Sequence, residues 1–342
     1  MNMKWVVALL ASAVVASQVC ALADVEKFTG SAKTVIRPAM ETDAKEIALP
    51  RSYAAGLWDK AVHVALGPLD LAEIGQQDAK RLNEEKTLRI GVERDLPEAV
   101  SLSKAKSRLG QWVALDDGSH VWRLTVGAEG AFGLRVHVTG LSMPDACELR
   151  TFDVQDPVQT RGPYTNTTIK RRSHFWTGTV FAGSVTLECY CPPGVAPADV
   201  AFTVDKIAHV YRNPNNVAKE GTCHNDVTCF PDWTTTANGV AGIGSFDNRN
   251  FLWCTGCLLN DLDDTTFVDY FMTANHCVGG QSEADDTEFY WFYQTATCDG
   301  TVPSLASVPM TDGGADYLAG QTRATGNDFA FLQLRMPPPP GV

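Results

Sequence analysis

Two stretches in the C-terminal third decide the fold: Trp253–Asn260 (WCTGCLLN) and Thr273–Cys277 (TANHC). The first is a strand-forming run that contains a glycine, and the second is a turn of small residues that ends in a histidine and a cysteine. A histidine delivered by a strand is a candidate general base, because such a base must be held within hydrogen-bond reach of its nucleophile. The alternative is a core or metal-binding histidine beside an unrelated thiol.

A second candidate residue follows about fifty positions later. Asp328 stands in the run Gly326–Leu334 (GNDFAFLQL), directly before an apolar strand. By itself it could be an ordinary loop aspartate that caps a strand. After His276 in the chain, it can instead be the carboxylate that orients the imidazole and stabilises its protonated form.

These stretches together resemble the histidine region of trypsin-like serine proteases. In that family a Cys-x-Gly-x-Leu strand is bridged to the cysteine that follows the catalytic histidine, which implies a bridge between Cys254 and Cys277. Such a bridge restricts the backbone that carries His276, and closing a loop of this size contributes roughly 3 kcal/mol. The resemblance also implies that His276 is the general base and Asp328 its orienting carboxylate.

The resemblance is most specific to bacterial lysyl endopeptidases. Three runs carry it: Cys223–Cys229 (CHNDVTC), Trp291–Cys298 (WFYQTATC), and Asp328–Val342 with its PPPPGV ending. It covers residues 221–342, and more loosely the preceding β-rich region, which looks like a propeptide. It implies a Cys229–Cys298 bridge and a partner for Cys223 in a second barrel. Cys257 departs from the family, which usually has a small residue there, and a Cys254-x-x-Cys257 redox motif is disfavoured on a strand.

The catalytic serine of such an enzyme does not occur in the sequence. The serines of the protease-like part are Ser245, Ser282, Ser304 and Ser307, and none has a Gly-x-Ser-Gly context. The nucleophile, the oxyanion hole and the specificity pocket would belong to a missing second barrel. We therefore expect the sequence to be an N-terminal fragment, inactive as it stands.

Composition and the N-terminus set the broad class. The 342 residues are 44% hydrophobic and 20% charged, with a net charge of −12, which disfavours nucleic acid as a partner. Lys4, the apolar run from Trp5 to Ala16 and the small-x-small motif before Asp24 predict a signal peptide over residues 1–23. Of the ten cysteines, those of the exported chain are expected to form disulfides.

The region before the protease-like part is expected to be a β-sandwich. Strands are predicted from near Gly110 onward, because large apolar and polar residues alternate and turn-forming clusters separate the runs. Either Cys189 or Cys191 could reach Cys147 in a disulfide, and metal binding by these three thiols is the alternative. The predicted strands are 120–126, 134–138, 147–152, 175–180, 185–191, 289–293 and 329–334, with a hairpin of 253–259 and 267–273.

The sequence thus predicts a mostly β protein, with a β-sandwich-like prodomain before the first barrel of a chymotrypsin-like double barrel. The expected segments are a signal peptide at 1–23, a leading propeptide segment at 24–105, the prodomain at 106–212, a linker at 213–221 with a cleavage site near Lys219, and the protease half at 222–342. The expected function is a secreted, monomeric serine endopeptidase precursor that acts on polypeptides, without metal, cofactor or membrane span. The alternatives are a non-catalytic secreted binding protein and, more weakly, a metal-dependent hydrolase.

Overall fold

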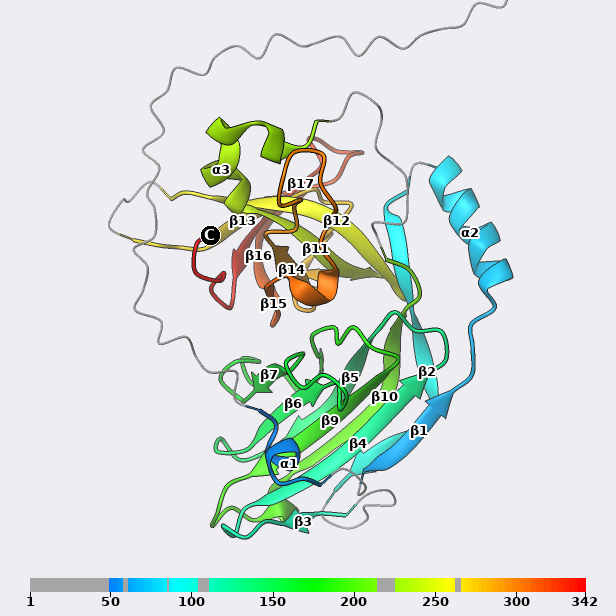
Figure 1. Cartoon of the computed structure of the whole chain (residues 1–342), viewed down its shortest axis with the longest axis vertical. Coiled ribbons are helices and arrows are strands. Elements are labelled where there is room, and N and C mark those ends of the chain that lie inside the picture. Colours follow the sequence, from blue (N-terminus) through cyan, green and yellow to red (C-terminus); the bar gives the residue numbers. More distant parts are fainter. Residues whose placement is uncertain (1–48, 58–60, 85, 104–110, 214–224, 262–265) are drawn as a thin grey trace, which may run out of the picture.

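The structure is a computed structural model that describes residues 49–57, 61–84, 86–103, 111–213, 225–261 and 266–342. The signal peptide, most of the expected linker, Lys219 and Cys223 lie outside these residues. Figure 1 shows two β-rich halves, the N-terminal one below and the C-terminal one above. Within the described ranges, no helix has the length and apolar character needed to cross a membrane.

The N-terminal half contains two β-sheets that enclose one core. One sheet has the order β1-β4-β9-β6-β7 with β3 beside β4, and the other contributes β2, β10, β5 and β8. Trp122 and Leu124 of the first sheet meet Val136 and Val204 of the second, all fully buried. Alternation places one side-chain set of each strand on this buried face, and the expected β-sandwich is confirmed. Its elements are α1 (Arg51–Ala54), β1 (Val62–Leu66), α2 (Leu71–Asn83), β2 (Leu88–Leu102), β3 (Val113–Ala114), β4 (His120–Ala128), β5 (Gly133–Ser142), β6 (Glu148–Phe152), β7 (Arg161–Tyr164), β8 (Phe175–Trp176), β9 (Ser184–Cys191), η1 (Pro197–Asp199) and β10 (Ala201–Val210).

The prediction that strands begin near Gly110 is wrong, because β1 and the long strand β2 precede it. In β2, the sequence between Arg89 and Glu98 is rich in charged residues and contains Pro97. These residues hide the alternation that marks a strand. Pro97 is tolerated because the pairing of β2 with β10 shifts register around Val204, where a ladder N–H is not required.

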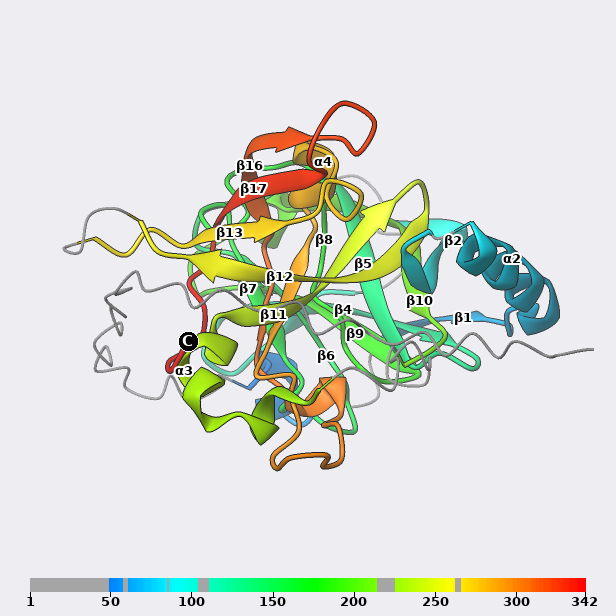
Figure 2. The same ribbon diagram turned by 90° about the horizontal axis from the view of Figure 1, so that it is seen from above.

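The C-terminal half is the curled sheet expected of a first barrel. Its strands follow the order β15-β14-β11-β12, and β12 continues through β13 to β17 and β16. Phe271, Phe289, Trp291 and Leu332 are fully buried between the curled layers. Figure 2 shows β13, β17 and β16 side by side at one rim. The elements are η3 (Val227–Cys229), η4 (Pro231–Trp233), α3 (Thr234–Asn238), β11 (Val240–Asp247), β12 (Asn250–Leu259), β13 (Tyr270–Thr273), α4 (Gln281–Ala284), β14 (Glu288–Trp291), η5 (Leu305–Ser307), β15 (Met310–Thr311), β16 (Ala315–Gln321) and β17 (Phe329–Leu334).

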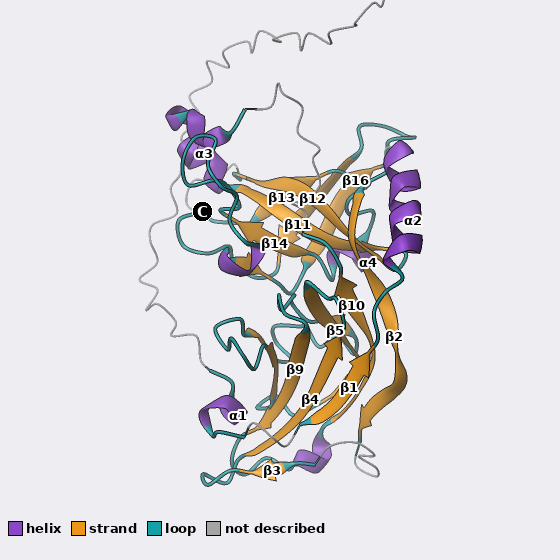
Figure 3. Cartoon of the chain, turned by 45° about the vertical axis from the view of Figure 1, so that its right-hand side comes forward, coloured by secondary structure: helices purple, strands orange, loops and turns teal. Residues whose placement is uncertain are grey.

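A single sheet joins the two halves. Strand β2 pairs with β10 in the sandwich and also with β12 in the barrel, where Leu88 lies opposite Trp253 and Gly91 opposite Phe251. A Cβ atom on Gly91 would lie 3.0 Å from the carbonyl oxygen of His209, so glycine suits this close approach. Figure 3 shows β2 running from one half into the other.

A buried ion pair lies at the centre of the contact between the halves. Arg135 Nε of β5 is 3.3 Å from Glu288 Oε1 of β14, and both side chains are almost fully buried. Thr179 donates to Glu288 through its N–H and its hydroxyl, and Tyr290 donates to the same carboxylate at 2.6 Å. A second guanidinium nitrogen of Arg135 donates to the carbonyl of Asp286 at 2.9 Å. Each charge therefore has hydrogen-bond partners that offset part of its removal from water, although Nη1 of Arg135 is buried without one.

Aromatic rings pack beside this ion pair. The guanidinium carbon of Arg135 lies 5.0 Å from the ring centre of Phe246 and 5.3 Å from that of Phe251. Trp176 of β8 stacks on Phe246 of β11 at 4.6 Å. The contact thus combines a desolvated charge pair with buried aromatic surface.

Three cysteines of the sandwich are buried together. The Sγ atoms of Cys147 and Cys191 are 2.7 Å apart, and Cys189 lies two residues away on the same strand. The hydrogen bond with Cys191, together with burial, raises the pKa of the Cys147 thiol. The structure therefore brings Cys191 closest to Cys147, although all three appear as thiols.

Replacing Arg135 is expected to destabilise the chain far more than replacing a surface arginine. Arg135→Met leaves Glu288 without its cation, and loss of one partner of a buried pair typically costs about 3–5 kcal/mol. Arg171→Met is the matched control, because its ion pair with Asp145 is about 70% exposed on both sides and such pairs contribute about 0–1 kcal/mol. Chemical denaturation of the intact chain measures both effects. Equal effects would contradict the central role of the Arg135–Glu288 pair.

Oxidation is expected to join Cys147 to Cys191 and to leave Cys189 as a thiol. The short distance between the first two sulfurs allows the bond with little backbone movement. Peptide mapping of the protein, alkylated after oxidative refolding, measures this directly. A labelled Cys191, or a Cys147–Cys189 cross-link, would be the contrary result.

Candidate active site

His276 follows strand β13 in a turn that is fixed on both sides. Thr273 Oγ1 at the end of β13 donates to the carbonyl of Thr255 on β12. Cys277, the next residue after His276, forms a disulfide with Cys254 of β12. Its carbonyl accepts a 2.7 Å hydrogen bond from the buried hydroxyl of Ser245 on β11. Three strands of the barrel therefore hold the backbone that carries the imidazole.

Asp328 is brought to His276 by the pairing of β13 with β17. Thr273 lies opposite Ala330 in this antiparallel pair, so the residues just beyond them meet at the rim. Asp328 Oδ2 is 2.7 Å from His276 Nδ1, and Oδ1 accepts from the His276 backbone N–H at 3.1 Å. Both carboxylate oxygens thus bind one residue, which fixes the plane and the tautomer of the ring.

The backbone of Asp328 is left-handed, with φ of +52°. Aspartate tolerates this region better than most residues, because its short side chain can hydrogen-bond locally. The conformation lets the carboxylate turn back toward His276 before β17 begins. We interpret it as a local strain that the two hydrogen bonds to His276 offset.

The carboxylate is covered while the ring is open to solvent. The side chain of Asp328 is 16% exposed and that of His276 is 44% exposed. The hydrogen bond from the His276 side chain lowers the pKa of Asp328 below its ordinary value, and the His276 N–H acts in the same direction. Arg323 Nε, 3.3 Å from Oδ2, also favours the ionised form. Since Nδ1 is engaged by Asp328, Nε2 is the nitrogen that can take up or release a proton.

The structure joins the cysteines that the resemblance implies as pairs. Cys229 is bonded to Cys298, and Cys254 to Cys277. Cys257 is a half-buried thiol whose pKa is raised by burial. Because Cys254 is bonded to Cys277, a Cys254–Cys257 redox pair does not form. Cys223 lies outside the described residues.

The described residues contain two clusters of potential metal ligands, and neither is suited to a metal ion. His276 lies close to the sulfurs of Cys254 and Cys277, and Asp299 lies close to those of Cys229 and Cys298. In both clusters the two sulfurs form a disulfide, so neither is available as a thiolate ligand. The chemistry of these residues is therefore better suited to proton transfer at His276.

Three of the four serines of this half have structural contacts in the fold. Ser245 binds the carbonyl of Cys277, Ser304 accepts from the N–H of Ala306, and Ser307 donates to the carbonyl of Ser304. Sequence reasoning missed Arg323 and Ser245 as supporting residues. It also missed Thr87, whose hydroxyl lies 3.5 Å from the carbonyl oxygen of His276. A distant hydroxyl that meets the site through folding leaves no local signal in the sequence.

Comparison with known proteins finds matches in both halves of the chain. Residues 65–211 match the family of the lysyl endopeptidase N-terminal domain, and residues 217–342 match that of the lysyl endopeptidase C-terminal domain. A lysyl endopeptidase from Pseudomonas aeruginosa is 26% identical over 254 residues, which cover 68% of this chain and 53% of that protein. The chain thus spans about half the length of this relative. Each half therefore matches its own lysyl endopeptidase domain, and the chain resembles the lysyl endopeptidases in both halves.

Proposed function

We propose that this chain carries the N-terminal domain and the first barrel of a secreted serine endopeptidase that cleaves after lysine. The observation that supports this most directly is the 2.7 Å contact between His276 Nδ1 and Asp328 Oδ2, at the rim of a domain that matches the lysyl endopeptidases. The disulfide next to His276 supports the same interpretation. Secretion is supported by the signal peptide predicted over residues 1–23 and by the disulfides.

The proposed mechanism uses His276 as general base and then as general acid. A serine of a second barrel, outside these 342 residues, attacks the carbonyl carbon of the peptide bond while Nε2 of His276 takes its proton. Asp328 accepts from Nδ1–H and stabilises the imidazolium that forms. The proton then passes to the departing amine, and water repeats the sequence on the acyl-enzyme with His276 again as base.

The N-terminal domain is proposed to be a propeptide, separated from the protease by cleavage near Lys219. The two separate family matches support a division between residues 211 and 217. This domain covers the barrel through β2, the Arg135–Glu288 pair and the stacked aromatics, so it is well suited to guide folding of the barrel or to restrain it.

Substitutions in the proposed pair are expected to remove activity without unfolding the protein. Both variants are made in the protein produced from the complete coding sequence. His276→Ala removes the general base, and Asp328→Asn removes the carboxylate that holds the His276 ring in one tautomer. Each is expected to lower kcat on a lysyl peptide amide about 10⁴-fold. Asp232→Asn, an exposed aspartate of the same half, is the control and is expected to retain activity. Undiminished turnover by His276→Ala, or no lysine-directed turnover by the wild type, would refute the proposal.

The contribution of Asp328 to stability is expected to depend on pH with a definite sign. Because the folded state lowers the pKa of Asp328, the ionised carboxylate stabilises the fold at neutral pH. This contribution persists as pH falls to the ordinary aspartate pKa of about 3.9, and it is lost as pH falls through the lower pKa of the folded state. Denaturation of wild type and Asp328→Asn between neutral and strongly acid pH measures it. The difference between the two proteins should shrink on acidification, and a constant difference would contradict the assigned contact.

A further inference from the structure

Two strands, β13 and β2, share one edge of strand β12 close to His276. One edge of β12 is covered by β11. On the other edge, β13 pairs at Cys257–Leu259 and β2 pairs at Asn250–Trp253, both antiparallel to β12. The intervening residues 254–256 lie where the chain leaves β13 for the His276 turn. Strand β2 begins at Leu88, opposite Trp253. The residues just before Leu88 therefore lie toward His276.

The peptide bond between Lys86 and Thr87 lies beside the candidate site. Thr87 Oγ1 is 3.5 Å from the carbonyl oxygen of His276, although 189 positions separate these residues in sequence. Lys86 precedes Thr87, and its side chain is 56% exposed. The bond between Lys86 and Thr87 is thus presented at the edge of the barrel by an N-terminal domain that pairs with β12 immediately afterward.

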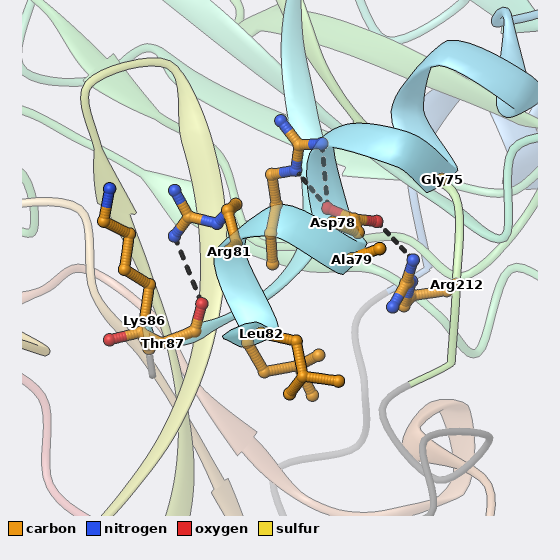
Figure 4. Close-up of a pocket in the computed structure, with 10 residues that line it drawn as sticks. Gly75, Asp78, Ala79, Arg81, Leu82, Lys86, Thr87 and Arg212 are labelled. Atoms are coloured by element: carbon orange, nitrogen blue, oxygen red, sulfur yellow. Dashed lines mark hydrogen bonds and ion pairs between the residues drawn. The ribbon is translucent and has the colours of Figure 1, made fainter. Parts of the chain in front are cut away.

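Helix α2 holds this segment in position. Arg81 Nη2 of the helix donates to the carbonyl of Thr87 at 3.1 Å. Asp78 of the same helix binds Arg89 of β2 at 2.8 Å and also pairs with Arg212. A hollow of about 220 Å³ lies between the helix and the start of β2. Figure 4 shows Arg81 beside Thr87, and Asp78 beside Arg212, among the residues that line it. The helix acts as a clamp on the backbone next to Lys86.

We propose that the Lys86–Thr87 bond is a cleavage site that the protease cuts within its own N-terminal domain; this rests on the proposed function. Strand addition to an edge is a common way to bind an extended peptide. Here the added strand β2 runs away from His276 after Leu88. The bond between Lys86 and Thr87 then has a lysine on its acyl side, as lysine-directed cleavage requires. Lys80 is a poorer candidate, since it lies within helix α2.

The reaction is an ordinary hydrolysis. The serine oxygen bonds to the carbonyl carbon of Lys86 while His276 takes the serine proton. The bond from this carbon to the nitrogen of Thr87 then breaks, and the proton passes from His276 to the new amine of Thr87. Water then releases the carboxylate of Lys86 from the enzyme. The cut removes the covalent link between α2 and β2, so only the hydrogen bond of Arg81 and the ion pair of Asp78 still join the helix to the start of the strand. The grip of the N-terminal domain on β12 is then expected to weaken.

The experiment follows new N-termini in the protein produced from its complete coding sequence. Mass spectrometry of wild type after secretion should find a fragment that begins at Thr87. Lys86→Ala should lower its yield by about a hundredfold or more, whereas the control Lys80→Ala, whose exposed side chain also lies near Glu84, should leave it unchanged. His276→Ala should give no such fragment. The rate at which the Thr87 fragment forms should not change when the protein is diluted about tenfold, because each molecule holds its own Lys86–Thr87 bond at the site.

Cleavage of an external lysyl peptide, measured in the same samples, separates failure of this proposal from failure of the proposed function. If the peptide is cut but no N-terminus forms at Thr87, the internal site is wrong and the protease function stands. A Thr87 fragment that forms in His276→Ala, or at a rate that falls with dilution, shows cleavage by another molecule and also overturns the proposal. If neither the peptide nor Lys86 is cut, the protease function itself fails.

Discussion

Strand β12 is the constraint on which the rest of the structure depends. Its backbone pairs with β11 along one edge and with β13 and β2 along the other, and its Cys254 is bonded to the residue after His276. Because the side-chain period of a strand is two, a slip of one residue would turn Cys254 away from Cys277 and move every β12 side chain to the opposite face. The register of this one strand therefore fixes the histidine, the barrel and the junction with the N-terminal domain together.

The sequence predicts the local parts of this arrangement better than the long-range ones. The strands β4, β5, β9, β12 and β17 alternate clearly and form as expected, and His276 and Asp328 meet as the resemblance implies. The leading segment contains more strand than its sequence pattern indicates, because several charged residues of β2 face other residues rather than solvent. Arg89, for example, is buried against Asp78 of helix α2, a contact that no local pattern reveals.

The joining of the two halves could not be predicted for a related reason. Edge pairing of β2 with β12 uses backbone N–H and C=O groups, which every residue other than proline carries, so the sequence contains no signature of the partner. The buried Arg135 and Glu288 are separated by more than one hundred and fifty positions, and each alone resembles an ordinary surface charge. Only the fold shows that they are desolvated against each other.

A buried ion pair suits the proposed role of the N-terminal domain as a propeptide, in which the contact forms specifically and later comes apart. Removing two charges from water costs about as much as their attraction returns, so Arg135 and Glu288 contribute alignment more than net affinity. When the halves separate, both groups regain water, which offsets the lost attraction. Apolar surface of the same size would instead be exposed at full cost. The aromatic stack of Trp176 on Phe246 and the backbone pairing of β2 are then left to supply the affinity. Any event that weakens the pairing of β2 with β12 therefore lowers the affinity between the two halves directly.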